Sequence, residues 1–266
     1  MKTRIISAII VLLIAIPIIL YGGGVYNLFI YIISLLGLKE FMNIKETKKK
    51  IPDFIKFISY IIMTLIVIAS PKQNELMFTM DYRIISGLFM VYLIPTVLYH
   101  DNNKYSIRDA FYLIGGLFFL GLSFHLLIIL RSIQLELLIF LFLITIMTDT
   151  FAYFSGYLIG RHKMLESISP NKTWEGLIGG TVMGVFISSV FYLTVINPNI
   201  NISTLLIATT FLSIVGQYGD LVFSAIKRYY GKKDFSNLMP GHGGVLDRLD
   251  SIIFVILGYM FFISLL

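Results

Sequence analysis

The 266-residue sequence contains no cysteine and a single tryptophan, and Asp, Glu, Lys and Arg together make up only 14% of it. The absence of cysteine excludes disulfide bonds and cysteine-ligated metal sites, so any metal ion would need oxygen or histidine ligands. Such ligands favour a hard cation, and we expect Mg²⁺. Because soluble proteins carry about 25% charged residues, the low charged fraction excludes an ordinary soluble domain.

Apolar residues dominate the chain: they form 57% of it, and the mean hydropathy is +0.86. A helix needs about 20 apolar residues to cross a bilayer, and helices satisfy their backbone hydrogen bonds within lipid. We therefore predict an all-α fold, a polytopic integral membrane helix bundle with about nine transmembrane helices. The predicted spans are residues 5–21, 25–38, 55–70, 84–99, 111–130, 137–160, 176–196, 203–219 and 251–266.

The distribution of Lys and Arg predicts the orientation of these spans. With the N-terminus inside, 17 of the 21 basic residues fall in inner segments and only Lys72, Arg83 and Arg131 in outer ones, with Lys56 uncounted at a boundary. Because basic residues concentrate in cytoplasmic loops, we predict a cytoplasmic N-terminus and a multi-pass protein of the cell (plasma) membrane.

The chain has 21 basic and 15 acidic residues. A basic excess is typical of loops that face anionic lipid, and we expect no nucleic-acid partner. The lysine-rich segment 45–50, KETKKK, is interpreted as a topology signal, with attraction of anionic lipid as the alternative.

We predict a single integral-membrane domain over residues 1–266. Residues 1–136 form N-terminal helices with little motif content, whereas residues 137–266 contain the catalytic helices and cytoplasmic loops. Three polar clusters interrupt this second part, and the predicted topology places all three on the cytoplasmic side or open towards it. Their coincidence indicates an active site that faces the cytoplasm.

The first cluster lies within the span 137–160, where Asp149, Tyr153 and Gly156 fall on one helical face. An ionised Asp about halfway along a span is unfavourable against lipid. We therefore expect Asp149 to face the bundle interior or a wet cavity. It is either a structural carboxylate between helices or a part of the active site.

The second cluster, SPNKTWEG, begins at Ser169 and directly precedes the span 176–196. Ser169 or Thr173 can cap the following helix, and Glu175 suits its positive N-terminal end. Capping does not explain Lys172, because a cation opposes the helix dipole unless an anion is shared. We expect a phosphate held by Lys172 and the free backbone N–H groups.

The third cluster runs from Asp220 to Asp250. If the eighth span continues as a helix, one face carries Asp220, Ser224, Lys227 and Arg228. A solvated stripe would show the same spacing, but it does not require the PGHGG turn that follows, whose glycines let the backbone approach a ligand. His242 in this turn is either a general acid or base, or a brace for the turn.

The charges of the third cluster suit metal-bound phosphates. Asp220 and Asp247 are the predicted Mg²⁺ ligands, because Mg²⁺ keeps several waters and bridges to substrate phosphates. Phosphoryl-group chemistry then needs little beyond positioning and electrostatic stabilisation. The cations that can neutralise the phosphate charge are Lys227, Arg228, Lys233 and Arg248.

The third cluster also resembles a known signature. The string S-x-x-K-R-x-x-x-x-K-D, followed by P-G-H-G-G-x-x-D-R-x-D, extends from Ser224 to Asp250 and resembles the signature of the phosphatidate cytidylyltransferase (CDP-diacylglycerol synthase) family. D-T-x-A-Y at Asp149 and S-P-x-K-T-x-E-G at Ser169 are also similar to that family. The resemblance covers about residues 140–266, and the N-terminal half agrees only in its hydrophobic spans.

This resemblance implies an enzyme that condenses CTP with phosphatidic acid to form CDP-diacylglycerol and pyrophosphate, with Mg²⁺ as cofactor, in a homodimer. It implies that Asp220 and Asp247 bind the metal and that Lys172 and other cations bind CTP or the lipid phosphate. The predicted catalytic residues are Asp220, Asp247, Lys227, Arg228 and Arg248. The predicted substrate-binding residues are Asp149, Ser169, Lys172, Thr173, Ser224, Lys233, Asp234, His242, Gly243, Gly244 and Asp250.

The chain departs from the family pattern at Phe223, where an acidic residue is common, and at Phe235 and Ser236, where Ser-Gly is common. The missing carboxylate would either alter metal occupancy or belong to a peripheral position. One alternative function is another CTP-dependent lipid cytidylyltransferase or kinase, similar to CDP-archaeol synthase or polyprenol kinase. A transporter of an anionic substrate is less favoured, because transporters usually show repeats and midplane sites.

Overall fold

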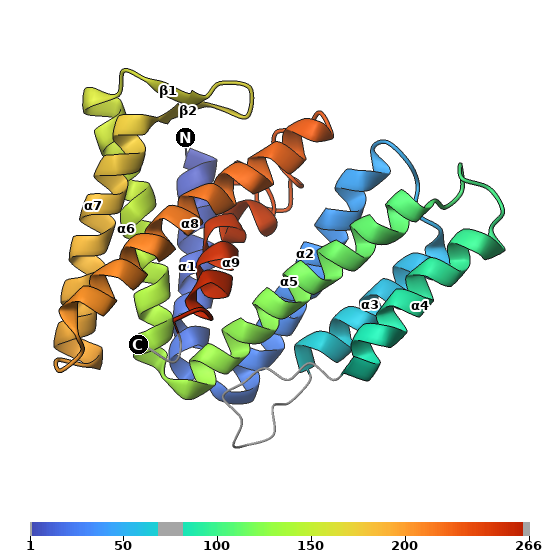
Figure 1. The fold of residues 1–266 in the computed structure, drawn as a ribbon, viewed down its shortest axis with the longest axis horizontal. Helices are drawn as coiled ribbons and strands as arrows, with labels where there is room; N and C mark the ends of the chain where they lie inside the picture. Colours follow the sequence, from blue (N-terminus) through green and yellow to red (C-terminus); the bar gives the residue numbers. More distant parts are fainter. Residues whose placement is uncertain (1, 69–81, 263–266) are drawn as a thin grey trace.

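The computed structural model describes residues 2–68 and 82–262, which form nine α-helices and one short antiparallel hairpin (Figure 1). The all-α prediction is confirmed. Lys72 and the last residues of the third and ninth predicted spans lie outside the described residues. The elements are α1 (Lys2–Tyr21), α2 (Gly23–Glu46), α3 (Asp53–Ile68), α4 (Tyr82–Leu98), α5 (Ile107–Ile133), α6 (Leu135–Ile159), β1 (Lys163–Leu165), β2 (Ser169–Thr173), α7 (Trp174–Phe191), the π-helical turn Tyr192–Ile196, α8 (Ile202–Tyr229) and α9 (Leu246–Tyr259).

Five helices are long and apolar enough to cross a membrane, namely α2, α5, α6, α7 with its π-helical turn, and α8. Shorter apolar stretches occur in α1 and α4, at Ile9–Tyr21 and Ile85–Leu98. These helices confirm a multi-pass, membrane-type protein. The number of about nine transmembrane helices stays a prediction.

Two helices extend well beyond the predicted spans. Helix α8 continues past residue 219 to Tyr229, and α2 continues past residue 38 to Glu46. Most charged residues in the two extensions have protein partners, and these contacts accompany the helix beyond its apolar stretch; Lys39 is exposed. Helix α9 begins at Leu246, before the predicted start at residue 251. The hairpin was not predicted, because strands of three and five residues are too short to show a period.

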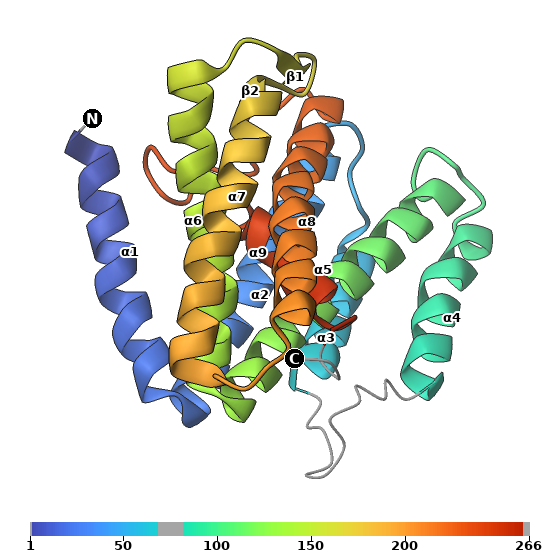
Figure 2. The ribbon, with the colours of Figure 1, turned by 60° about the vertical axis from the view of Figure 1, so that its left-hand side comes forward.

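Helices α6, α7 and α8 occupy one side of the molecule and α2 to α5 the other, with α9 between them (Figure 1). Helix α9 contacts α8, α5, α6 and α2, so it lies between the two groups of helices. Helices α1 and α4 lie at opposite margins when the molecule is turned (Figure 2). The N-terminal and C-terminal helices therefore meet at α9.

Helices α6 and α7 pack through glycine. A Cβ atom added to Gly180 would lie 2.6 Å from the carbonyl oxygen of Thr148, and one added to Gly176 would lie 2.8 Å from that of Ala152. Small residues allow helix backbones to approach this closely. The packing fixes the start of α7 against α6, and with it the β2 residues that immediately precede α7.

The lysine-rich segment 45–50 fastens α2 to other helices. Lys45 and Lys49 both form ion pairs with Asp109 of α5. The ammonium of Lys48 lies 3.5 Å from the ring centroid of Tyr229 at the end of α8, a cation–π contact. A segment interpreted as a topology signal thus also has a packing role.

Candidate active site

The polar face of α8 is covered by protein groups. The Lys227 ammonium lies 2.7 Å from Oδ1 of Asp247 and is buried with it. The Ser224 hydroxyl donates to Oδ1 of Asp220 at 3.3 Å. Arg228 donates to the carbonyl oxygens of Ile168 and Lys232. The face is therefore not a solvated stripe: it organises the segments that surround it.

Lys172 of β2 joins the second cluster to the third. Its ammonium lies 2.7 Å from Oδ2 of Asp220 and 3.2 Å from the carbonyl oxygen of Gln217, both on α8. The Lys172 and Asp220 side chains are 27% and 31% exposed. This pair is partly exposed and therefore more accessible than the buried pair of Lys227 and Asp247.

The first cluster reaches the same place. Ser251 at the start of α9 donates to Oδ2 of Asp149 at 3.4 Å. The carboxyl group of Asp250 interacts with those of Asp220 and Asp149 and with the ammonium of Lys227. Three carboxyl groups from α6, α8 and α9 thus gather beside two lysines. Asp149 contacts Ser251 of α9 but is exposed, so its orientation towards the bundle interior or a wet cavity stays a prediction.

The turn between α8 and α9 closes on itself through the backbone. The N–H groups of His242 and Gly243 donate to the carbonyl oxygen of Met239, and the Met239 N–H donates to the carbonyl oxygen of Gly243. Gly241 and Gly243 have φ of 78° and 83°, a region that favours glycine. A Cβ atom at Gly243 would lie 2.7 Å from Oδ2 of Asp247, so this glycine makes room for the carboxylate of the protein itself.

Asp247 is the centre of this turn. Its Oδ2 accepts hydrogen bonds from the backbone N–H groups of Phe235 and Gly244, both at 2.8 Å, while Oδ1 faces Lys227. Only 3% of the side chain is exposed. A buried charge needs such partners, and here they also join both ends of the loop.

The other predicted residues lie around this centre. Thr173 caps α7 by accepting from the Gly176 N–H at 3.1 Å, which confirms the capping prediction. Lys233 and Asp234 are exposed on the loop, and Ser169 is half-buried at the start of β2. Their roles in binding stay predictions.

His242 and Arg248 hold the outer side of the turn. Nδ1 of His242 lies 2.7 Å from the hydroxyl of Ser7 on α1, and Arg248 donates to the carbonyl oxygen of His242 at 3.0 Å. Arg248 is otherwise exposed. These contacts favour the bracing role of His242 over the role of general acid or base.

A divalent cation fits Asp220 best. In residues 2–68 and 82–262 no three His, Cys, Asp or Glu side chains converge as metal ligands. Mg²⁺ does not require such a set, since it keeps several waters and binds one or two carboxylates with substrate phosphates. Both carboxylates have protein donors on each oxygen, but the Asp220 side chain is 31% exposed and the Asp247 side chain only 3%. The assignment of Asp247 as a metal ligand stays a prediction.

The departures from the family pattern pack against each other. Phe223 is fully buried, and its ring centroid lies 5.7 Å from that of Phe235. Phe223 also contacts Phe119 and Phe254. An aromatic cluster thus occupies the position where the family commonly has an acidic residue, and this favours a position peripheral to the phosphates.

Glu40 of α2 is a further residue of this region that was not predicted from the sequence. Its carboxylate is 4% exposed and accepts hydrogen bonds from Ser236, Val245 and Leu246. The one available signal was an acidic residue beside a predicted apolar span, and it was hidden among the lysines that set the topology.

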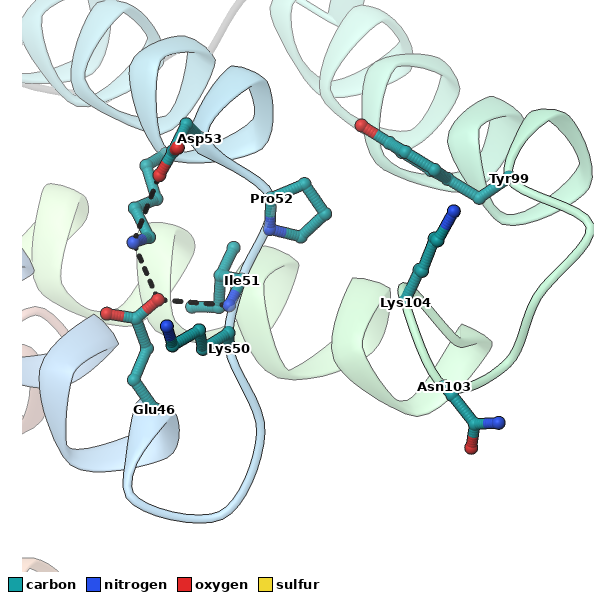
Figure 3. A pocket seen from close by; sticks show the side chains of 9 residues that line it. Glu46, Lys50, Ile51, Pro52, Asp53, Tyr99, Asn103 and Lys104 are labelled. Carbon is teal, nitrogen blue, oxygen red and sulfur yellow. Dashed lines mark hydrogen bonds and ion pairs between the residues drawn. The ribbon is translucent and has the colours of Figure 1, made fainter.

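A hollow of about 570 Å³ lies between the α2–α3 and α4–α5 connections, away from the residues of the candidate site (Figure 3). Lys56 pairs there with Glu46 at 2.6 Å and Asp53 at 3.4 Å. Lys50 and Lys104 also line it. The hollow contains none of the predicted site residues, so its volume does not mark the active site.

Fold and site together define a membrane-type α-helical protein whose lysines and carboxylates converge from separate signature segments. The cytidylyltransferase family model matches residues 2–266, and the chain belongs to this family. The match includes the N-terminal helices, for which the sequence analysis found no motif.

Several curated relatives are named phosphatidate cytidylyltransferase. The chain is 39% identical to the phosphatidate cytidylyltransferase of Staphylococcus haemolyticus, with 96% of both chains covered. It is 38% identical to that of Staphylococcus saprophyticus and 37% identical to that of Staphylococcus aureus, again with 96% of both chains covered. The similarity extends over nearly the whole chain.

Proposed function

We propose that this protein transfers a cytidylyl group from CTP to phosphatidic acid and releases CDP-diacylglycerol and pyrophosphate. The observation that carries the proposal is the 2.7 Å pair between Lys172 and Asp220, which joins two separate signature segments at a partly exposed position. The names of the relatives support the same reaction.

The reaction needs no covalent enzyme intermediate. An ionised phosphate oxygen of phosphatidic acid attacks the α-phosphorus of CTP, the new P–O bond forms, and the bond from the α-phosphorus to the bridging oxygen breaks. Pyrophosphate leaves with that bonding pair. Because the attacking oxygen carries no proton, a general base is not required, which agrees with the bracing role of His242.

The cations of the site bind and orient the phosphates. Lys172 exchanges Asp220 for a phosphate oxygen, and Arg228 and Arg248 extend exposed guanidinium groups from either end of the loop. Lys227 stays paired with Asp247 and adds positive potential from the buried side of the site. When bound at Asp220, Mg²⁺ supplies charge stabilisation to the transferring and leaving phosphates.

The proposed site faces the cytoplasm of the cell membrane, where CTP is available. Support comes from the excess of Lys and Arg on the side that carries the signature loop. The homodimer implied by the family resemblance is kept as part of the proposal.

The test is a reaction of the purified full chain with CTP and phosphatidic acid in detergent micelles. We expect Mg²⁺-dependent CDP-diacylglycerol, with label from the α-phosphate of CTP entering the lipid and label from the γ-phosphate leaving as pyrophosphate. Chelation with EDTA should abolish turnover, and added Mg²⁺ should restore it. Transfer of the γ-label to lipid would instead identify a kinase and contradict the proposal.

A further inference from the structure

We infer that Glu40, from the N-terminal half, is a positioning residue that holds the signature loop in the geometry used for cytidylyl transfer. The inference rests on the proposed function for its kinetic consequence. It assigns a role in the reaction to α2, a helix without signature residues.

The contacts of Glu40 join three points that lie far away in the sequence. Its Oε1 accepts from the Val245 N–H at 2.9 Å and from the Ser236 hydroxyl at 2.7 Å, and its Oε2 accepts from the Leu246 N–H at 2.9 Å. The first N–H groups of a helix have no partner within the helix. Glu40 therefore caps the start of α9 from another helix, where Val245 provides no side-chain cap.

Two carboxylates, those of Asp247 and Glu40, accept hydrogen bonds from different donors of the loop. Asp247 accepts from the N–H groups of Phe235 and Gly244. Glu40 accepts from the residue that follows each of these, namely from the Ser236 hydroxyl and the Val245 N–H. Each carboxylate thus joins the outgoing segment to the returning one. Loss of Glu40 would leave Asp247 as the remaining link of this kind.

The surroundings show that Glu40 acts on the backbone. Among the ion pairs of the described residues none includes Glu40, so its charge is stabilised by peptide N–H groups and the positive end of α9. A Cβ atom at Gly244 would overlap the Glu40 carboxylate. Gly244 is therefore required to leave space for Glu40, and the loop is fitted between α2 and α8.

The link to the reaction runs through Asp247 and Lys227. The residues that Glu40 holds, Val245 and Leu246, directly precede Asp247, which faces Lys227 at 2.7 Å. A misplacement of about 1 Å can lower a rate by about 100-fold. Glu40 touches neither pyrophosphate nor lipid in this proposal and acts by fixing those groups.

The test is Glu40→Gln in the full chain. Gln keeps the shape but places an NH₂ donor against one of the backbone donors. We expect kcat to fall about 10-fold to 100-fold while KM for CTP changes less than about threefold. Hydrogen exchange of the Val245 and Leu246 amides should become faster. The matched control is Glu46→Gln on the same helix, which should keep kcat within about twofold.

A second variant, Ser236→Ala, removes one donor without disturbing the carboxylate. It should lower kcat about threefold, and it keeps the inference testable if Glu40→Gln fails to fold. Wild-type kcat in both variants, with unchanged amide exchange, would overturn the positioning role. A wild-type protein without turnover would refute the proposed function instead, and the amide exchange of Glu40→Gln would then decide the positioning role by itself.

Discussion

Two lysine–aspartate pairs, Lys227–Asp247 and Lys172–Asp220, have the same N–O distance of 2.7 Å but lie in different surroundings. In the first pair the side chains are 9% and 3% exposed, and Asp247 also accepts two backbone N–H groups. In the second pair they are 27% and 31% exposed. Burial therefore separates two pairs that distance alone would make equivalent.

The difference in exposure indicates different roles for the two lysine–aspartate pairs. Breaking a buried pair leaves an uncompensated charge in a low-dielectric interior, whereas an exposed pair contributes little to stability. The inner pair holds the loop, and the outer pair is free to meet substrate. We therefore expect substitutions in the inner pair to change stability and substitutions in the outer pair to change turnover.

The largest effect is expected when the inner pair is broken. Lys227→Met should lower the free energy of unfolding by about 3–5 kcal/mol, because Asp247 remains buried without its cation. The measurement is unfolding in detergent micelles, with Lys172→Met as the matched control at a cost of about 1 kcal/mol or less. Equal stability of the two variants would remove the distinction between the pairs.

The outer pair should show its effect in turnover. Asp220→Asn removes the accessible carboxylate, and we expect kcat to fall about 100-fold to 1,000-fold with the free energy of unfolding changed by about 1 kcal/mol or less. Initial rates over a range of Mg²⁺ concentrations measure the loss. Asp53→Asn, at a fully exposed position beside the separate hollow, serves as the control. Wild-type rates for Asp220→Asn would contradict its role.

The smallest expected effect sharpens the comparison. In a double-mutant cycle of Lys172→Met and Asp220→Asn, the coupling free energy for unfolding should stay below about 1 kcal/mol. The same cycle with Lys227→Met and Asp247→Asn should give a larger coupling, since removing both charges avoids an unpaired one. A larger coupling in the outer pair than in the inner pair would show that exposure is a poor guide here.

Helix periodicity and capping were sufficient to predict several features of the site. The spacing of Asp220, Ser224 and Lys227 predicted one helical face, and Thr173 was a predicted cap; both follow from local geometry. The all-α class followed from hydropathy. Local patterns of this kind need no knowledge of distant contacts.

Contacts between distant segments could not be predicted in this way. Glu40 reaches residues 196 to 206 positions away, and the Lys48 contact with Tyr229 joins the two halves of the chain. Asp247 was predicted as a metal ligand from its charge, while its backbone donors depend on how the loop folds. Helix packing determines these contacts, and it produces no periodic pattern in the sequence from which they could be predicted.

The glycine contact between α6 and α7 limits how a lipid can arrive. Backbone atoms of Thr148 and Ala152 would lie within 3 Å of a Cβ atom at Gly180 or Gly176, so the seam has no width for an acyl chain. A two-tailed substrate must therefore reach Asp220 along another face of the bundle. The close packing of α6 against α7 thereby restricts the lipid path to the other faces of the bundle.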